Sequence, residues 1–327
     1  MKLIGIDLGG TKIASAIFNE NGAIESRNVI KLGERRGRDV GQLIMQMIET
    51  FIRQAEKNGE NIASIGISVP GIYNAEHGRV WAPNIPEWDD YPLPDEVRSL
   101  PSVANKIVSI DSDRACYILG ETWQGKTIGC RNAIFVAFGT GIGAGILVDD
   151  TILRGQDDIA GAIGWMGMNA PYDDKYKPCG HFEYYASGDG IARTAREYLD
   201  KNQHTPSKLR GIIPNQLTAH HVFDAFCEGD LVAKEVLDYC IELWGMAIAN
   251  LVSIFNPRKV ILGGGVFGPA AQFLDQIKLE AKKWAQPISF AKVDVDVSAL
   301  GSDAGLIGAG YLALRALLNR ETKMQER

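Results

Sequence analysis

The 327-residue sequence lacks features that would place it in several large classes of protein. It holds only five cysteines, an odd number scattered between Cys116 and Cys240, so we expect reduced thiols rather than a disulfide framework. It has no excess of positive charge, because 34 Lys and Arg stand against 40 Asp and Glu and give a net charge of −6. Binding to nucleic acid or to an anionic membrane therefore has no electrostatic support, and we expect neither.

Long apolar runs and flexible linkers are also missing. No run reaches the roughly 18 apolar residues of a membrane span, and we expect no membrane segment. The short apolar start, Met1–Ile6, runs straight into Asp7, which does not fit a secretory signal peptide. We therefore expect a cytoplasmic protein. No Pro-, Gly- or Ser-rich linker interrupts the chain, so we expect tightly coupled lobes rather than separate domains.

Glycine is what the sequence has in excess, at 36 of 327 residues, and the glycines follow predicted strands. A strand over residues 2–7 leads through a glycine turn into a second strand over 13–18, and the same pattern recurs over 131–138 and 144–148. These two hairpins, roughly 130 residues apart, predict an internal duplication. Strands alternate with helices, which predicts an α/β fold. The expected helices cover residues 39–58, 189–200, 230–256 and the segment from 304 onward.

The glycine turns expose backbone N–H groups that phosphate oxygens can approach closely. A single turn of this kind is as readily a plain hairpin, but two in matching positions and a third cluster after the strand over 259–262 favour a nucleotide site. The turns lead into strands, unlike a P-loop or a dinucleotide-binding loop, which lead into helices. Asp7 stands where a strand meets the first turn, a position suited to holding hydrated Mg²⁺ beside phosphates.

Four segments resemble the motifs of a known family. Ile4–Ile13 is similar to the first phosphate motif of the actin/hexokinase/Hsp70 ATPase superfamily, and in particular to sugar kinases of the ROK family. Phe138–Gly145 resembles the second phosphate motif, Val260–Val266 the adenosine motif, and Leu300–Ala309 the C-terminal segment. The resemblance implies a two-lobed, actin-like (ribonuclease-H-like) fold with a cleft between the lobes. The small lobe would comprise residues 1–118 plus 304–327, and the large lobe residues 119–303.

The same resemblance implies an ATP-dependent kinase that transfers a phosphoryl group to a hydroxyl of a hexose or related sugar, with ATP and Mg²⁺ as cofactors. Because the first motif begins at residue 4, we expect no DNA-binding domain before it. Dimerisation through the large lobe is a family expectation. The residues expected at ATP, with Asp7 also holding Mg²⁺ through water, are Asp7, Gly9, Gly10, Thr11, Lys12, Gly139, Thr140, Gly141, Gly263, Gly264 and Gly265.

The residues expected to bind the sugar and to act as its base lie in segments that resemble the family less closely. Val108–Glu121 resembles the family's acidic–Asn–Asp–small–Asn stretch, which aligns the catalytic base with Asp113. Taken alone, an Asp-x-Asp pair before a helix is more often a cap than a base, so Asp111 and Asp113 could simply cap the following helix. The flanking motifs favour the base. The segment 72–94 is interpreted as a functional loop region rather than a packed element, although Trp88 could also pack it as a plain turn. The sugar contacts expected from the resemblance are Gly78, Asn84, Ser112, Asp113, Trp165 and Glu183.

The sequence departs from the family in two places. Gly161–Trp165 reads Gly-Ala-Ile-Gly-Trp where most members have Gly-Glu-x-Gly-His, so a carboxylate and an imidazole for the sugar are missing. The family's zinc loop is reduced to Cys179 and His181, and since a structural zinc takes four ligands we expect none. Ser112 and Ala115 stand where the family has its two Asn.

Three interpretations of these departures remain open. Trp165 can form an apolar wall for a sugar other than glucose, or Ala162 can open space for a larger glycoside. Alternatively, the chain is a degenerate member that binds sugar or nucleotide as a sensor without turnover. The intact Asp7, Asp113 and Glu183 favour a kinase. The two missing polar partners predict that glucose binds about 10²-fold more weakly than in a typical member.

Overall fold

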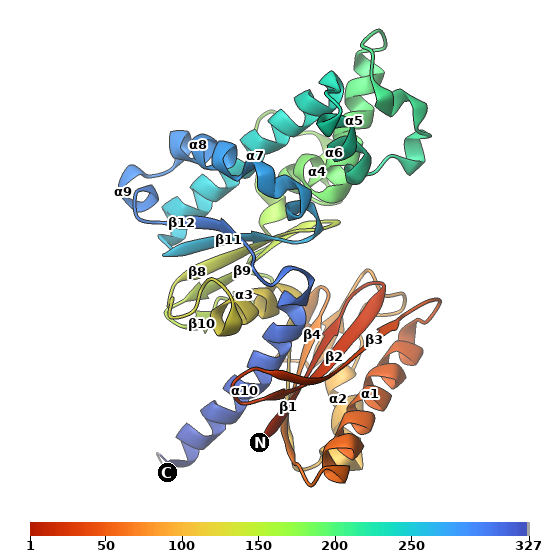
Figure 1. Cartoon of the computed structure of the whole chain (residues 1–327), viewed down its shortest axis with the longest axis vertical. Coiled ribbons are helices and arrows are strands. Elements are labelled where there is room, and N and C mark those ends of the chain that lie inside the picture. Colours follow the sequence, from red (N-terminus) through yellow and green to blue (C-terminus); the bar gives the residue numbers. More distant parts are fainter. Residues whose placement is uncertain (326–327) are drawn as a thin grey trace. The chain divides into compact units, whose positions relative to one another are not determined.

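The computed structural model describes residues 1–325 as an alternation of strands and helices (Figure 1). The chain divides into two compact units. Unit 1 contains Met1–Gly129, the short segment Arg154–Ala160 and the chain from Ser302 onward. Unit 2 contains Cys130–Leu153 and Gly161–Gly301.

The sheet of unit 1 has the strand order β3-β2-β1-β4-β7. Its first three strands are antiparallel neighbours, and β4 and β7 then add in parallel to β1. The ends of β1, β4 and β7 therefore lie at one edge of the sheet, where chemistry-bearing residues can gather. The strands are β1 (Lys2–Leu8), β2 (Lys12–Asn19), β3 (Ile24–Lys31), β4 (Ile62–Val69) and β7 (Ile107–Ser112).

The sheet of unit 2 repeats this topology in the order β10-β9-β8-β11-β12. Again three antiparallel strands are followed by two parallel ones. The predicted internal duplication is confirmed, since both halves place a glycine turn between their first two strands. The strands are β8 (Ala133–Phe138), β9 (Ile142–Val148), β10 (Thr151–Ile152), β11 (Lys259–Gly263) and β12 (Asp294–Val297).

Helices cover both faces of the unit 1 sheet. Figure 1 shows α1 and α2 on one side of the sheet and α10 on the other. The apolar stripe of α1 packs onto β1 and β4 in one core, whereas α10 crosses β4 so closely that a Cβ on Gly66 would lie 2.0 Å from the carbonyl oxygen of Ala309. Glycine is therefore required there. The helices are α1 (Gly37–Lys57), α2 (Leu93–Arg98), α3 (Asp113–Gln124) and α10 (Ala304–Gln325).

The core of unit 2 is built around α7, which packs against α8 and the sheet (Figure 1). By length and composition α7 could cross a membrane, but 61% of its most apolar window is buried inside the structure. Burial in this core accounts for its apolar character. The helices are α4 (His181–Ala186), α5 (Gly188–Lys201), α6 (Ala219–Cys227), α7 (Leu231–Phe255), α8 (Leu274–Trp284) and α9 (Pro287–Phe290).

The segment 72–94 is more ordered than its composition predicts. It forms a small hairpin of β5 (Ile72–Asn74) and β6 (Arg79–Trp81), and Tyr91 pairs back onto Val80. Trp88 is fully buried, stacks on Tyr91 and donates its indole N–H to the carbonyl of Gly37 at 2.9 Å. The interpretation as an unpacked loop region was wrong, because Trp88 and Tyr91 are core residues, whereas Trp81 is 44% exposed.

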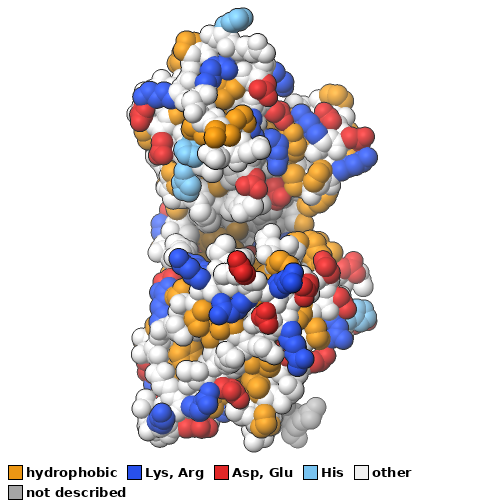
Figure 2. Space-filling view, turned by 90° about the vertical axis from the view of Figure 1, so that its right-hand side faces the viewer, with side chains coloured by type: hydrophobic (Ala, Val, Ile, Leu, Met, Phe, Trp, Pro, Cys, Tyr) orange, Lys and Arg blue, Asp and Glu red, His pale blue; other side chains and the backbone are white. Residues whose placement is uncertain are grey.

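The surface carries both signs of charge. On the face shown in Figure 2, Lys and Arg side chains are interspersed with Asp and Glu over both units. This distribution agrees with the small net charge of −6 and provides no broad positive field on that face.

Candidate active site

The first glycine turn closes between β1 and β2 in unit 1. The Gly9 N–H donates to the carbonyl of Lys12 at 2.9 Å, and the carbonyl of Thr11 accepts from the Leu32 N–H at 2.8 Å. These bonds hold the turn at the edge where β1 ends. A Cβ on Gly10 would lie 3.4 Å from the Cβ of Asn84, so the predicted sugar-side Asn84 lies beside this turn.

Asp7 lies directly before the turn. Its Oδ1 accepts a hydrogen bond from the Ser68 hydroxyl at 2.8 Å, and burial raises the pKa of its carboxyl to about 6. The start of α10 comes so close that a Cβ on Gly305 would lie 2.6 Å from Asp7 Oδ1. A carboxylate that is partly stripped of water favours a proton or a cation beside it, so the donor chemistry of Asp7 fits a magnesium ion with its water shell.

Asp113 stands at the junction of β7 and α3. Its Oδ1 accepts from the Arg114 N–H at 2.7 Å, and its Oδ2 lies 3.4 Å from the Tyr117 hydroxyl, which donates to it. Burial raises the pKa of Asp113, while Arg114 and the two hydrogen bonds oppose the rise. Both carboxylate oxygens are thus oriented by the first turn of α3.

The helix cap belongs to a different residue from the two that the sequence offered. Ser112 is the N-cap of α3, and its hydroxyl accepts from the Ala115 N–H at 3.3 Å. Neither Asp111 nor Asp113 has this role, so the capping alternative for Asp113 was wrong. The Ser112 hydroxyl is thus already engaged in the helix cap, and its expected contact with sugar stays a prediction.

Asp111 is held by a partner that the sequence did not reveal. Its buried carboxylate forms a two-pronged ion pair with the guanidinium of Arg154, at 2.8 and 2.5 Å. Arg154 opens the short segment of unit 1 that ends at Ala160, and Asp158 in the same segment accepts from the Ala75 N–H at 3.0 Å. This segment therefore braces the end of β7, immediately before Asp113. No local pattern predicts a pairing between residues 43 positions apart.

Gly78 has a local explanation. It adopts a φ of 64° in the turn between β5 and β6, and its N–H donates to the carbonyl of Asn74 at 2.9 Å. A left-handed turn position favours glycine without any ligand. Its predicted contact with sugar stays a prediction.

The second glycine turn, in unit 2, carries Glu183 against it. The Gly139 N–H donates to the carbonyl of Gly141 at 2.9 Å, and the Ile142 N–H donates to Glu183 Oε2 at 2.6 Å. A Cβ on Gly141 or on Gly164 would lie 2.7 or 2.8 Å from the same oxygen. Burial raises the pKa of Glu183. Two predicted motifs, the phosphate turn and residues 161–165, thus meet at one carboxylate.

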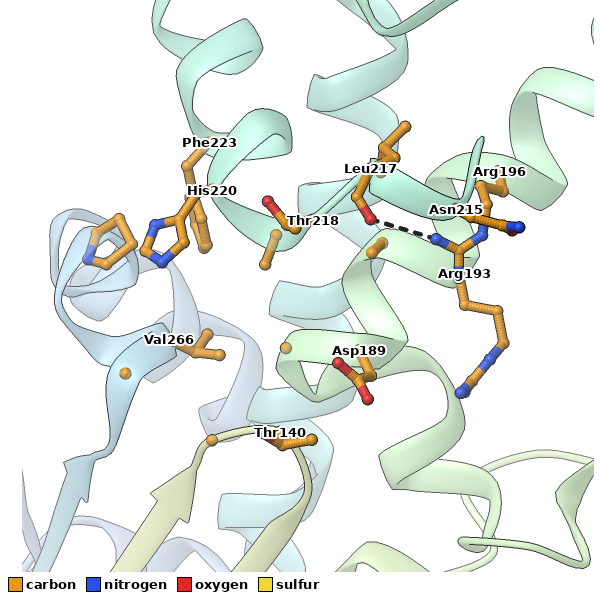
Figure 3. A pocket seen from close by; sticks show the side chains of 16 residues that line it. Thr140, Asp189, Arg193, Arg196, Asn215, Leu217, Thr218, His220, Phe223 and Val266 are labelled. Carbon is orange, nitrogen blue, oxygen red and sulfur yellow. Dashed lines mark hydrogen bonds between the residues drawn. The ribbon is translucent and has the colours of Figure 1, made fainter. Parts of the chain in front are cut away.

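A pocket of about 670 Å³ opens beside this turn, entirely within unit 2 (Figure 3). Gly139, Thr140 and Gly265 line it, and their contact with a nucleotide stays a prediction. Gly263 and Gly264 do not line it. Their Cβ positions would lie 2.3 Å from the Phe135 ring and 2.5 Å from the Phe138 carbonyl. Packing accounts for these two glycines, and their contact with a nucleotide stays a prediction.

Most of the pocket wall was missed by the sequence analysis. Figure 3 shows His220, Phe223 and Val266 on one side of the pocket and Arg193 and Arg196 on the other. Arg196 donates to the carbonyls of Pro214 and Leu217, both at 3.3 Å, and so fixes the loop before α6. The available signal was the polar series Asp189, Arg193 and Arg196, spaced i, i+4 and i+7 on one face of α5.

The remaining departures from the family lie near α4. Trp165 is 58% exposed at the end of a short 3₁₀ helix, Ile163–Trp165. Cys179 and His181 stand on either side of Gly180, and within residues 1–325 no three His, Cys, Asp or Glu side chains gather closely enough to hold a metal ion. The residues present therefore do not form the four-ligand zinc site of the family.

Comparison with known proteins identifies the relatives of this chain. The ROK family model matches residues 3–316. A glucokinase of Halalkalibacterium halodurans is 32% identical, with 94% of each chain covered. A xylose repressor of Caldicellulosiruptor bescii is 29% identical over 97% of this chain and 79% of its own.

Solved structures agree with the sequence relatives. The ROK hexokinase of Thermus thermophilus has a TM-score of 0.77 at 26% identity, with 98% of this chain and 100% of that chain covered. A ROK glucokinase of Streptomyces griseus, in complex with glucose and AMPPNP, has a TM-score of 0.72 at 27% identity, covering 96% of this chain and 100% of that chain. The predicted actin-like ATPase fold is thereby confirmed, and the chain belongs to the ROK family.

Proposed function

We propose that this protein transfers the γ-phosphoryl group of ATP to a hydroxyl of a hexose or related sugar, with Asp113 as the general base. The observation that carries the proposal is the carboxylate of Asp113, oriented by Arg114 and Tyr117 at the edge where β7 ends. The glucokinase relatives support the reaction class. An oriented carboxylate is what an acceptor hydroxyl needs, because phosphoryl transfer depends mainly on positioning and charge.

In the proposed step, the sugar hydroxyl gives its proton to Asp113 while its oxygen bonds to the γ-phosphorus. The bond from that phosphorus to the bridging oxygen of ADP breaks, and ADP leaves with the electron pair. The raised pKa of Asp113 makes it a stronger base than an exposed aspartate. Mg²⁺, when bound, would neutralise phosphate charge, and Asp7 is the residue that would hold it through water.

ATP is proposed to bind with its phosphates at the two glycine turns and its adenosine in the pocket of unit 2. The turns contribute Gly9, Gly10, Gly139 and Thr140, whose backbone groups lie at strand ends. The pocket supplies an apolar side and an arginine side, which suit a base and an anionic tail. Its volume of about 670 Å³ is within the usual range for such ligands.

Arg196 is expected to set the affinity for ATP without acting in the chemical step. Arg196→Lys keeps the charge but removes the guanidinium Nη1, the single nitrogen that donates to both carbonyls of the 214–217 loop. We expect the KM for ATP to rise about 5-fold, the effect of one weakened hydrogen bond, while kcat and the KM for sugar stay within 2-fold. Steady-state kinetics measure this. Arg53→Lys is the control, since Arg53 is 67% exposed on α1. A change in kcat alone would contradict the assignment.

For the sugar, we propose contacts from Asn84 and Asp113 in unit 1 and from Glu183 and Trp165 in unit 2, with weaker contributions from Gly78 and Ser112. Asn84 is supported by its place beside the first glycine turn, and Glu183 by its place against the second. The exposed ring of Trp165 offers a stacking surface.

A sensor without turnover is the alternative. The relationship to xylose repressors and the engagement of Ser112 in a helix cap favour it. Phosphorylation assays with a panel of sugars separate the two functions. For the kinase we further propose a cytoplasmic location, where ATP is available, and a homodimer formed through unit 2.

A further inference from the structure

A lysine in the loop before α4 is surrounded by aromatic rings. The ammonium nitrogen of Lys175 lies 5.3, 5.3 and 5.2 Å from the ring centroids of Tyr176, Tyr184 and Tyr185. The hydroxyls of Tyr176 and Tyr185 are 3.1 Å apart and share a hydrogen bond. A cation at this distance from several rings is attracted by the negative face of each. We refer to Lys175 and these three tyrosines as the lysine cage.

The lysine cage connects the loop to two helices. Tyr184 donates its hydroxyl to Glu197 of α5 at 2.6 Å, and Glu197 also lies 3.9 Å from the Lys175 ammonium. Arg193 of α5 stacks over the Tyr184 ring at 4.4 Å and donates to the Tyr184 carbonyl at 2.8 Å. The Lys175 ammonium and the tyrosine rings thereby link the loop before α4 to both α4 and α5.

The cage occupies the stretch where family members carry a zinc loop. Of the possible ligands only Cys179 and His181 remain, and the His181 ring packs against Tyr176 and Tyr185 at 4.6 and 5.2 Å. The Nδ1 of His181 is buried with no hydrogen-bond partner among the described residues. That orphaned nitrogen is a candidate metal ligand, but among the described residues it belongs to no group of three His, Cys, Asp or Glu side chains, and a structural zinc takes four ligands.

We infer that the lysine cage replaces the zinc site as the cation-centred brace of this loop, and that Lys175 is a positioning residue for Glu183. The positioning role of Lys175 rests on the proposed function, in which Glu183 contacts the sugar. Tyr184 and Tyr185 directly follow Glu183 in α4, and the Glu183 carboxylate is held on the second glycine turn by the Ile142 N–H. Loosening the rings frees the helix turn that aims this carboxylate.

The test begins with the wild-type protein, purified without added metal. We expect well under one zinc per chain by elemental analysis, and a chelator should leave the melting temperature unchanged. One zinc per chain, or a melting temperature lowered by chelator, would overturn the replacement of zinc by the cage. This arm needs no variant and no activity.

Lys175→Met removes the cation and keeps most of the side-chain length. We expect the melting temperature to fall by about 4–8 °C, because the variant loses several cation–π contacts together with the ion pairs of Lys175 with Asp173 and Glu197. Lys175→Arg retains a cation over the rings and should restore most of the loss. The matched control is Lys177→Met, because Lys177 is 68% exposed and pairs with the exposed Asp174 three positions before it. Equal melting temperatures for Lys175→Met and Lys177→Met would overturn the cage.

Steady-state kinetics test the positioning role separately from the role as a brace. In Lys175→Met we expect the KM for sugar to rise about 5-fold, the effect of one weakened hydrogen bond, with the KM for ATP unchanged and recovery in Lys175→Arg. An unchanged KM for sugar beside a lowered melting temperature would refute positioning and keep the brace. If no sugar supports turnover at all, the proposed function fails, while the zinc and melting arms still decide the cage.

Discussion

Asp113→Asn is expected to lower turnover by about 10²–10⁴-fold, the usual size of general-base help. The amide keeps the shape of the side chain and can still hydrogen-bond a sugar, but it cannot take the proton. The dissociation constants for sugar and ATP should change little, because the lost interaction matters in the transition state. Steady-state kinetics together with calorimetric titration of both ligands measure these quantities.

Thermal stability separates catalysis from folding in this variant. The pKa of Asp113 is raised by burial, so its charged form costs stability at pH values above the ordinary aspartate range. Removing that charge should leave the melting temperature equal or slightly higher near neutral pH. Ser112→Ala is the contrasting variant, since it deletes the observed cap and should cost about 1 kcal/mol. Full turnover in Asp113→Asn would remove Asp113 as the base.

Gly139→Val is expected to weaken ATP binding by about 10- to 100-fold, because a branched side chain would keep phosphate oxygens from the backbone N–H groups of the turn. The fold should tolerate the change. A Cβ at Gly139 would meet its nearest atom, the carbonyl oxygen of Gly141, only at 4.0 Å. Sugar affinity should persist. Calorimetry with ATP and with sugar measures both affinities.

Gly167→Val is the matched control for this substitution. Gly167 also belongs to unit 2, its Cβ would meet nothing within 4 Å, and it lies outside the lining of the pocket. Its ATP affinity should equal that of the wild type. An unchanged ATP affinity in Gly139→Val would refute the assignment of this turn to phosphate.

The sheets were predictable because their signals are local. Apolar runs followed by glycine turns identified β1, β2, β8 and β9, and the equal spacing identified the duplication that the strand orders confirm. The expected helix over 39–58 is α1 over residues 37–57. These features depend on side chains that are neighbours in sequence, where periodicity and turn chemistry act directly.

The missed parts of the site depend on side chains brought together by the fold. Arg154 reaches Asp111 across 43 positions, and the pocket combines α5, the 214–217 loop and the chain after β11. His220 was not recognised because its sequence context is that of an ordinary surface residue. It is exposed, but it lines the pocket. Aromatic and glycine positions are ambiguous for the opposite reason. Trp88, Gly263 and Gly264 are residue types that are common in binding sites, yet close packing explains each of them.

ADP release by the wild-type protein, measured with ATP, Mg²⁺ and a panel of monosaccharides, amino sugars and disaccharides, tests the proposed kinase most directly. We expect release that depends on at least one sugar and yields a sugar phosphate. Glucose should be a poor substrate, since Ala162 and Trp165 replace two polar partners. Glucose as the best substrate at a sub-millimolar KM would contradict only this view of the pocket. Binding of sugar and ATP with no sugar-dependent ADP release across the panel would contradict the kinase itself and leave a sensor.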